Sequence, residues 1–106
     1  FQLGRVGQAL KDLRMACELD QENDYNWQFL GSIYYEIDRY KEAMQCYDTA
    51  INLNPREAYY YYNRGLAGYE MNDLKSACRD WSRAADMGDL DALQMFRENC
   101  LFELDK

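Results

Sequence analysis

The amino-acid sequence matches itself when it is shifted by 34 residues. Residues of the same kind then coincide in five pairs: Trp27 with Tyr61, Gly31 with Gly65, Ala43 with Ala77, Tyr47 with Trp81, and Ala50 with Ala84. A fixed period of this length is typical of proteins built from stacked repeat units. The chain is therefore expected to fold as similar units packed side by side.

The N-terminal segment also fits this period. It aligns with the second half of the following unit: Ala9 with Ala43, Leu13 with Tyr47, and Ala16 with Ala50. The first half of that earlier unit is absent. Because the chain begins at Phe1 without an initiating methionine, we interpret it as a fragment or a processed piece.

Apolar residues recur at intervals of three and four, as Trp27, Leu30, Tyr34 and Ile37 do. This spacing places them on one face of a helix. Proline occurs once and β-branched residues are few, so strands have little support. The pattern predicts helices over 5–19, 24–37, 40–53, 56–71, 74–87 and 90–103. Their short connections make neighbouring helices antiparallel.

Polar residues, glycine and proline mark the predicted helix ends. We expect Asp24 to cap the second helix, and Asn54 to cap the fourth with Pro55 at its first position. Gly88 is expected to end the fifth helix and Asp89 to cap the sixth.

Recurring small residues indicate where helices approach closely. Gly31 and Gly65 lack a side chain, and the matched alanines are small, so the partner helix of each pair can come near. Gly68 stands where the preceding unit has Tyr34 and leaves space in the core. We expect the large side chain of Trp81 to fill that space.

With these residues the chain resembles the tetratricopeptide repeat, whose pattern is W-x-x-L-G-x-x-Y, A-x-x-x-F and P. The first full unit matches it at seven positions: Trp27, Leu30, Gly31, Tyr34, Ala43, Tyr47 and Pro55. The second unit departs from it at three, with Arg64 for the leucine, Gly68 for the tyrosine and Asp89 for the proline. The second unit is therefore a degenerate copy in the same frame.

The resemblance implies an all-α fold, a right-handed superhelical array of antiparallel helix pairs, or α-solenoid. A single domain over 1–106 is expected: 1–23 is the second half of a truncated repeat, 24–57 a full repeat, 58–89 a degenerate repeat, and 90–106 a capping helix and tail. The C-terminal segment also resembles the related Sel1-like repeat over fewer positions. The capping helix is expected to cover the last pair with its apolar residues Leu90, Leu93, Met95, Phe96 and Leu101.

In this family the first helices of the units line a concave groove that binds extended peptides or partner segments. The resemblance places the following residues at this groove: Tyr25, Gln28, Ser32, Tyr35, Tyr59, Tyr62, Asn63, Leu66, Tyr69 and Arg97. Tyrosine combines a large contact area with few rotatable bonds and a hydroxyl. Within the run of four tyrosines, we expect Tyr60 and Tyr61 to pack between repeats, and Tyr59 and Tyr62 to face the groove.

Some family members bind a C-terminal carboxylate through a clamp of lysines, asparagines and an arginine. Asn63 and Arg97 align with two clamp positions, but Gln28, Ser32 and Leu93 replace a lysine, an asparagine and a lysine. A carboxylate would lose its hydration there with too little compensation, so no such clamp is expected.

Charge and composition exclude several classes of function. Twelve basic residues against 19 acidic ones give a net charge of −7, so nucleic acid is not an expected partner. The apolar runs are shorter than the roughly 20 residues of a membrane span, so no membrane insertion is expected. The chain lacks histidine and any C-x-x-C pair, so neither catalysis, a metal site nor another cofactor is expected.

The four cysteines, Cys17, Cys46, Cys78 and Cys100, are expected to be free thiols in the core, although their even number permits two disulfides. Free thiols favour a reducing compartment such as the cytoplasm, and nothing else in the sequence indicates the localisation.

The sequence therefore predicts a non-catalytic module that binds a peptide or protein segment in a tyrosine-rich groove. The alternative is a structural or self-assembly segment of a longer repeat protein. Val6, Leu10 and Leu13 of the first helix would lack a covering helix, and this uncovered face favours a homo-oligomer.

Overall fold

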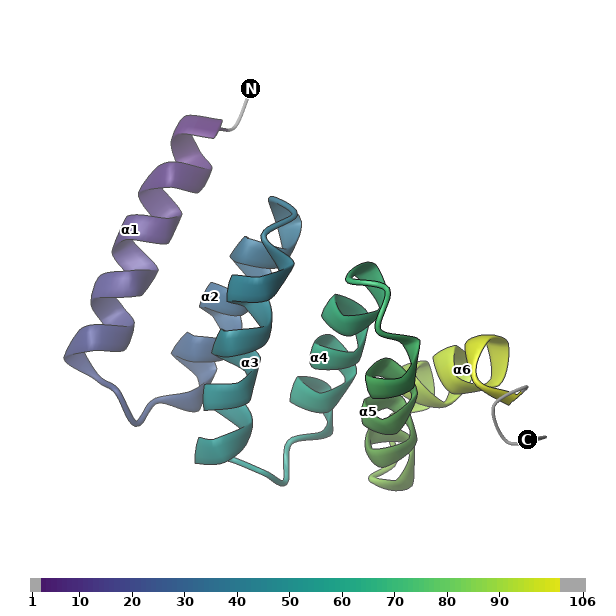
Figure 1. The fold of residues 1–106 in the computed structure, drawn as a ribbon. Coiled ribbons are helices and arrows are strands. Elements are labelled where there is room, and N and C mark those ends of the chain that lie inside the picture. Colours follow the sequence, from purple (N-terminus) through teal and green to yellow (C-terminus); the bar gives the residue numbers. More distant parts are fainter. Residues whose placement is uncertain (1–2, 102–106) are drawn as a thin grey trace.

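The computed structural model describes residues 3–101, and this part of the chain is all-α. Its helices are α1 (Leu3–Leu19), α2 (Asp24–Glu36), α3 (Tyr40–Leu53), α4 (Ala58–Glu70), α5 (Leu74–Asp86) and α6 (Leu90–Asn99). Figure 1 shows α1 to α5 standing side by side, with α6 turned across the end of the row. The predicted array of antiparallel helix pairs is confirmed, while the division into repeats stays a prediction. None of the described helices has the length and apolar character needed to cross a membrane.

The helices pack as the pairs α2 with α3 and α4 with α5, and α3 joins the two pairs by packing on α4. Two hydrogen bonds also link α2 to α4. The Tyr60 hydroxyl donates to Asp24 Oδ2 at 2.6 Å near the start of both helices, and the Tyr35 hydroxyl donates to Glu70 Oε2 at 3.4 Å near their ends. The two first helices are therefore parallel neighbours.

Glycine allows the close approach within each pair, as predicted. A Cβ atom placed on Gly31 would lie 2.7 Å from Tyr47 Cε1, and one on Gly65 would lie 2.5 Å from Trp81 Nε1. Both rings are buried, with Tyr47 exposed by 2% and Trp81 by 0%. The rings therefore lie directly on the backbone of the facing helix.

The expectation that Trp81 fills the space beside Gly68 stays a prediction. Trp81 is buried, but its indole lies on Gly65, and the atoms nearest to a Cβ on Gly68 are backbone atoms of Asp73 and Ala77 at 3.7 Å. Gly68 lies at the end of the helix pair, where the chain turns into α5 and its backbone closes over the glycine. The Asp73 N–H donates to the Gly68 carbonyl at 2.9 Å.

Helix ends repeat with the same period as the core. Asp38 after α2 and Asn72 after α4 both have left-handed φ angles, of 64° and 62°, and lie 34 residues apart. In each case the next residue donates to a carbonyl five positions earlier, which is the Schellman arrangement. Gly88, with φ of 101°, ends α5 in the same way, and Asp89 caps α6 by accepting from the Ala92 N–H at 3.0 Å, both as predicted.

Two predicted caps were wrong. Asn23, one residue before Asp24, caps α2 by accepting from the Asn26 N–H at 3.2 Å. The fourth helix begins at Ala58 with Glu57 as its cap, because Asn54 to Glu57 form a turn with Pro55 at its second position. Proline suits that turn position as well as a first helical position, so the sequence alone left both readings open.

Two of the cysteines form a disulfide, which corrects the expectation of four free thiols. Cys78 of α5 and Cys100 after α6 are bonded, with Cα atoms 5.7 Å apart. The crossing of α6 over α5 creates this proximity, and no spacing in the sequence indicates it. Cys17 and Cys46 are buried free thiols, and burial raises the pKa of Cys46 to about 12. The compartment argument from reduced cysteines therefore loses its basis.

The capping helix covers the end of the array with fewer side chains than expected. Ala92 and Cys100 are buried, and Met95 and Phe96 pack against the core. Leu90, the first residue of α6, is 77% exposed and therefore does not contribute. Leu101 is 50% exposed, and 102–106 lie outside the described residues.

Reduction of the Cys78–Cys100 disulfide should lower the free energy of unfolding by about 3 kcal/mol, because the bond closes a 22-residue loop in the unfolded chain. Urea denaturation with and without reductant measures this difference. The Cys78→Ser/Cys100→Ser variant is the control, and its free energy of unfolding should be the same with and without reductant. Denatured, unreduced protein should contain two titratable thiols, and four would contradict the disulfide.

Candidate functional site

A hollow of about 380 Å³ lies between the beginnings of α2 and α4. It is lined by Tyr25, Gln28, Phe29, Glu57, Tyr59 and Tyr60. We call it the α2–α4 hollow. Three of the residues predicted at the groove, Tyr25, Gln28 and Tyr59, meet here because the two helices are parallel and their first turns are adjacent.

Aromatic rings form most of the wall of the α2–α4 hollow. Tyr25, Tyr59 and Phe29 are exposed by 60%, 48% and 43%. The rings of Tyr25 and Phe29 meet edge to face with centroids 5.9 Å apart, and the ring of Tyr59 stacks with that of Tyr62 at 6.4 Å. Large rings exposed in one place and braced against each other are typical of recognition surfaces.

Two buried amides lie on the same helices. Gln28 is 6% exposed, and its Nε2 donates to Ser32 Oγ at 2.9 Å. Asn63 is 7% exposed, and its Nδ2 has no acceptor among the described residues. An unpaired buried donor costs free energy of about 1–3 kcal/mol. Of the two amides, only Gln28 lines the α2–α4 hollow.

A carboxylate and a hydroxyl connect the two sides of the hollow. The Tyr60 hydroxyl bond to Asp24 lowers the pKa of that carboxyl, and Asn54 Nδ2 donates to the same oxygen at 3.2 Å. Burial and the Asp24 charge raise the pKa of Tyr60. Asp24 is therefore negatively charged and Tyr60 neutral at physiological pH.

The charges of the first helices are almost all negative. The α2 segment contains no lysine or arginine, and Arg64 is the single basic residue of α4. Arg64 bonds Asp80 of α5 through two nitrogens, at 2.8 and 2.9 Å, and Asp48 of α3 at 3.0 Å. This cation is thus held on the α3 and α5 side of α4 and neutralised there.

The remaining predicted groove residues occupy several environments. Tyr62 and Leu66 pack against the core cluster of α4 and α5, and burial followed by the charges of Asp91 and Asp89 raises the pKa of Tyr62. Tyr69 is 42% exposed with its ring 5.8 Å from that of Trp81. Tyr35 is half-buried against Tyr40, and Arg97 is exposed on α6.

The run of four tyrosines divides as predicted for two of its members. Tyr60 and Tyr61 are buried, with exposures of 4% and 5%, while Tyr59 is exposed and Tyr62 is half-buried. Phe29, Glu57 and the hydroxyl of Tyr60 were not predicted at the hollow. Phe29 follows Tyr25 by one helical turn, a spacing that could have identified it.

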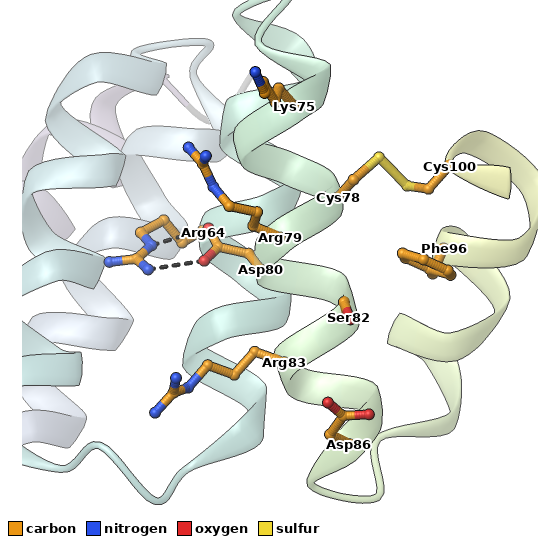
Figure 2. Close-up of a pocket in the computed structure, with 10 residues that line it drawn as sticks. All are labelled: Arg64, Lys75, Cys78, Arg79, Asp80, Ser82, Arg83, Asp86, Phe96 and Cys100. Atoms are coloured by element: carbon orange, nitrogen blue, oxygen red, sulfur yellow. Dashed lines mark hydrogen bonds and ion pairs between the residues drawn. A yellow bond between two sulfur atoms is a disulfide. The ribbon is translucent and has the colours of Figure 1, made fainter. Parts of the chain in front are cut away.

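A larger hollow of about 680 Å³ surrounds the outer side of α5, and none of the predicted groove residues lines it. Figure 2 shows Lys75, Arg79 and Arg83 on one side of α5, and the disulfide with Phe96 on the other. The Arg64–Asp80 pair closes its inner edge. Its exposed charges are of both signs, which is usual for a solvated helix face.

A family model described as "TPR repeat" matches residues 31–72. Over this segment the chain is similar to tetratricopeptide repeats. The matched segment contains the close-approach glycines Gly31 and Gly65, and both left-handed helix ends at Asp38 and Asn72.

Similar proteins include the mitochondrial import receptor subunit TOM70 of Homo sapiens and of Rattus norvegicus. Each is 29% identical over 72 residues, which cover 63% of this chain and 12% of the receptor. The chain therefore spans only a small part of the length of those relatives.

Two solved structures show the same fold. The first TPR of Spaghetti (RPAP3), bound to the HSP90 peptide SRMEEVD, superposes with a TM-score of 0.84 at 21% identity, covering 92% of this chain and 79% of that one. The crystal structure of MamA superposes with a TM-score of 0.83 at 25% identity, covering 90% of this chain and 57% of that one.

The Tyr60 hydroxyl should control the titration of Asp24. In the wild type the pKa of Asp24 should lie below the usual value of an aspartate, and Tyr60→Phe should raise it, because the variant loses the hydrogen bond to the ionised form. Carboxyl-carbon NMR titration measures both values. The matched control is Tyr61→Phe. The Tyr61 hydroxyl donates to the Pro55 carbonyl and not to Asp24, so this variant should leave the pKa of Asp24 unchanged.

The same bond makes stability depend on pH. The pKa of Asp24 is lower in the folded chain than in the unfolded chain, so its contribution is complete above about pH 4 and is lost as the pH falls through the folded value. Tyr60→Phe should therefore reduce the loss of stability below pH 4. An unchanged Asp24 pKa in Tyr60→Phe would contradict the assignment.

Proposed function

We propose that this chain is a non-catalytic interaction module whose α2–α4 face binds an extended peptide or a segment of a partner protein. The α2–α4 hollow is the observation that carries the proposal, because it combines exposed Tyr25, Phe29 and Tyr59 rings in one concavity. Such rings contribute large contact areas with little loss of side-chain entropy on binding.

Hydrogen-bonding groups at the α2–α4 hollow support a peptide as the ligand. An extended peptide presents backbone carbonyls and N–H groups at regular intervals, and Tyr25 and Tyr59, which line the hollow, carry hydroxyls that can bond to them. Gln28 and Ser32 add further hydrogen-bonding groups nearby on α2. Aromatic contact would then provide affinity, and these polar groups would orient the peptide backbone.

One structural neighbour was solved with the HSP90 peptide SRMEEVD, and it shows that this fold can hold a peptide. We propose a different preference here, because Gln28 and Leu93 stand where the clamp has its two lysines, and Ser32 stands where it has an asparagine. An acidic C-terminus would lose its hydration on binding with too few ion pairs to compensate for the loss.

Removal of two exposed rings tests the proposal. Peptides selected from a random library on the intact chain should bind the Tyr25→Ala/Tyr59→Ala variant at least about tenfold more weakly, since each anchor ring contributes about 1 kcal/mol or more. Fluorescence anisotropy measures the affinities. Both side chains are about half exposed or more, so the fold should survive, which circular dichroism checks.

The control is Met87→Ala, an exposed apolar residue at the end of α5. Its affinity for the same peptides should stay within about twofold of the wild type, below the effect of one lost anchor. Undiminished binding by the folded double variant would place the binding surface elsewhere.

A second proposed role is self-association through α1. Met15 and Leu19 are 55% and 81% exposed and lie four residues apart on one face of this helix, roughly opposite Leu10 and Leu13, which pack against the core. A second copy could cover this apolar face. Sedimentation velocity over a range of concentrations tests the idea, and a strict monomer at high concentration would contradict it.

A further inference from the structure

We propose that the α2–α4 hollow selects a cationic side chain, an arginine or lysine of the bound peptide, and holds it between the aromatic rings. This inference rests on the proposed function, that the α2–α4 face binds a peptide. It adds the chemical class of the ligand: an extended segment with a positively charged residue, of opposite charge to the acidic peptide held by the structural neighbour.

The walls of the hollow have the composition that attracts cations. The faces of aromatic rings are electron-rich, and a guanidinium or ammonium group near them gains about 0.5–2 kcal/mol. Tyr25, Phe29 and Tyr59 are exposed by between 43% and 60%, so their rings are accessible. Tyr25 and Phe29 lie edge to face, so rings with different orientations border the same space.

Two carboxylates reinforce this attraction. Glu57 lines the hollow directly. Asp24 is hydrogen bonded to Tyr60, which also lines it, and that bond keeps the carboxylate ionised. A cation inside the hollow would therefore meet a negative charge at its edge, within a chain whose net charge is −7.

No residue that lines the hollow is basic. Arg64, the one cation of α2 and α4, is bonded to Asp80 and Asp48 on the far side of α4. Arg56 precedes Glu57 in the sequence but does not line the hollow. Within residues 3–101, no ion pair therefore neutralises Asp24 or Glu57, and a cationic ligand can do so.

The size of the hollow suits one long side chain. Its volume of about 380 Å³ lies near the lower end of the range for small-ligand sites, roughly 300–1,000 Å³. An aspartate or glutamate of the ligand would face Glu57 without a counter-ion. An apolar side chain would contact the rings but leave Glu57 without a partner.

Peptide pools with one fixed residue provide the test. Capped octapeptides would carry arginine, citrulline or glutamate at a central position, with the other positions randomised and a fluorophore at one end. Citrulline keeps the shape of arginine without its charge. Binding to the intact chain is followed by fluorescence anisotropy at low and high salt.

We expect the arginine pool to bind at least about fivefold more tightly than the citrulline pool, and the glutamate pool to bind most weakly. The difference between arginine and citrulline should shrink at high salt. Glu57→Gln should reduce it to about twofold or less. Glutamine keeps the side-chain oxygen that accepts from the Tyr59 N–H, so the α4 cap is preserved.

The matched control is Glu36→Gln, an exposed carboxylate at the other end of α2, which should keep the full arginine advantage. Equal binding of all three pools would overturn the selectivity while leaving peptide binding intact. An arginine advantage that persists in Glu57→Gln and in Tyr25→Ala would overturn its assignment to this hollow. Failure of every pool to bind the wild type would refute peptide binding itself.

Discussion

The contact of a buried aromatic ring with a glycine of the facing helix sets the geometry on which the rest of this structure depends. Tyr47 lies on Gly31 and Trp81 lies on Gly65, each without room for a Cβ atom. This contact brings the two helices of a pair so close that a ring of one helix touches the backbone of the other. Because it occurs twice at the same register, the pairs are alike, and α2 and α4 lie parallel with their first turns together. The α2–α4 hollow follows from that arrangement.

Much of the fold could be predicted, because small and large residues recur at fixed positions of each unit and these positions determine how its helices pack. The helices, the close-approach glycines and the burial of Tyr60 and Tyr61 all follow from the 34-residue offset. Features outside the repeat could not be read in this way. The disulfide depends on how α6 crosses α5, and the start of α4 depends on a turn in which Pro55 has two acceptable positions.

The site was only partly predictable, because α4 has neighbours on two sides. Tyr59 and Tyr60 face α2, whereas Leu66 and Tyr69 lie toward α5, so a single predicted stripe divides between two environments. The distribution of charge around the hollow could not be predicted from the sequence either. Arg64 appears in the sequence as a cation of the tyrosine-rich helix, yet its three hydrogen bonds hold it on the opposite side. The surface left at the hollow is aromatic and negative.

The stability of Gly65→Ala tests the glycine contact most directly. Alanine favours a helix over glycine by about 1 kcal/mol, so the substitution would stabilise the chain if the site were open. Its Cβ would lie 2.5 Å from the buried Trp81 indole, whereas a Cβ on Gly7 of α1 meets nothing within 4 Å. Urea denaturation should show Gly65→Ala destabilised by about 1–3 kcal/mol and Gly7→Ala stabilised by up to about 1 kcal/mol. A Gly65→Ala chain as stable as the wild type would contradict this account.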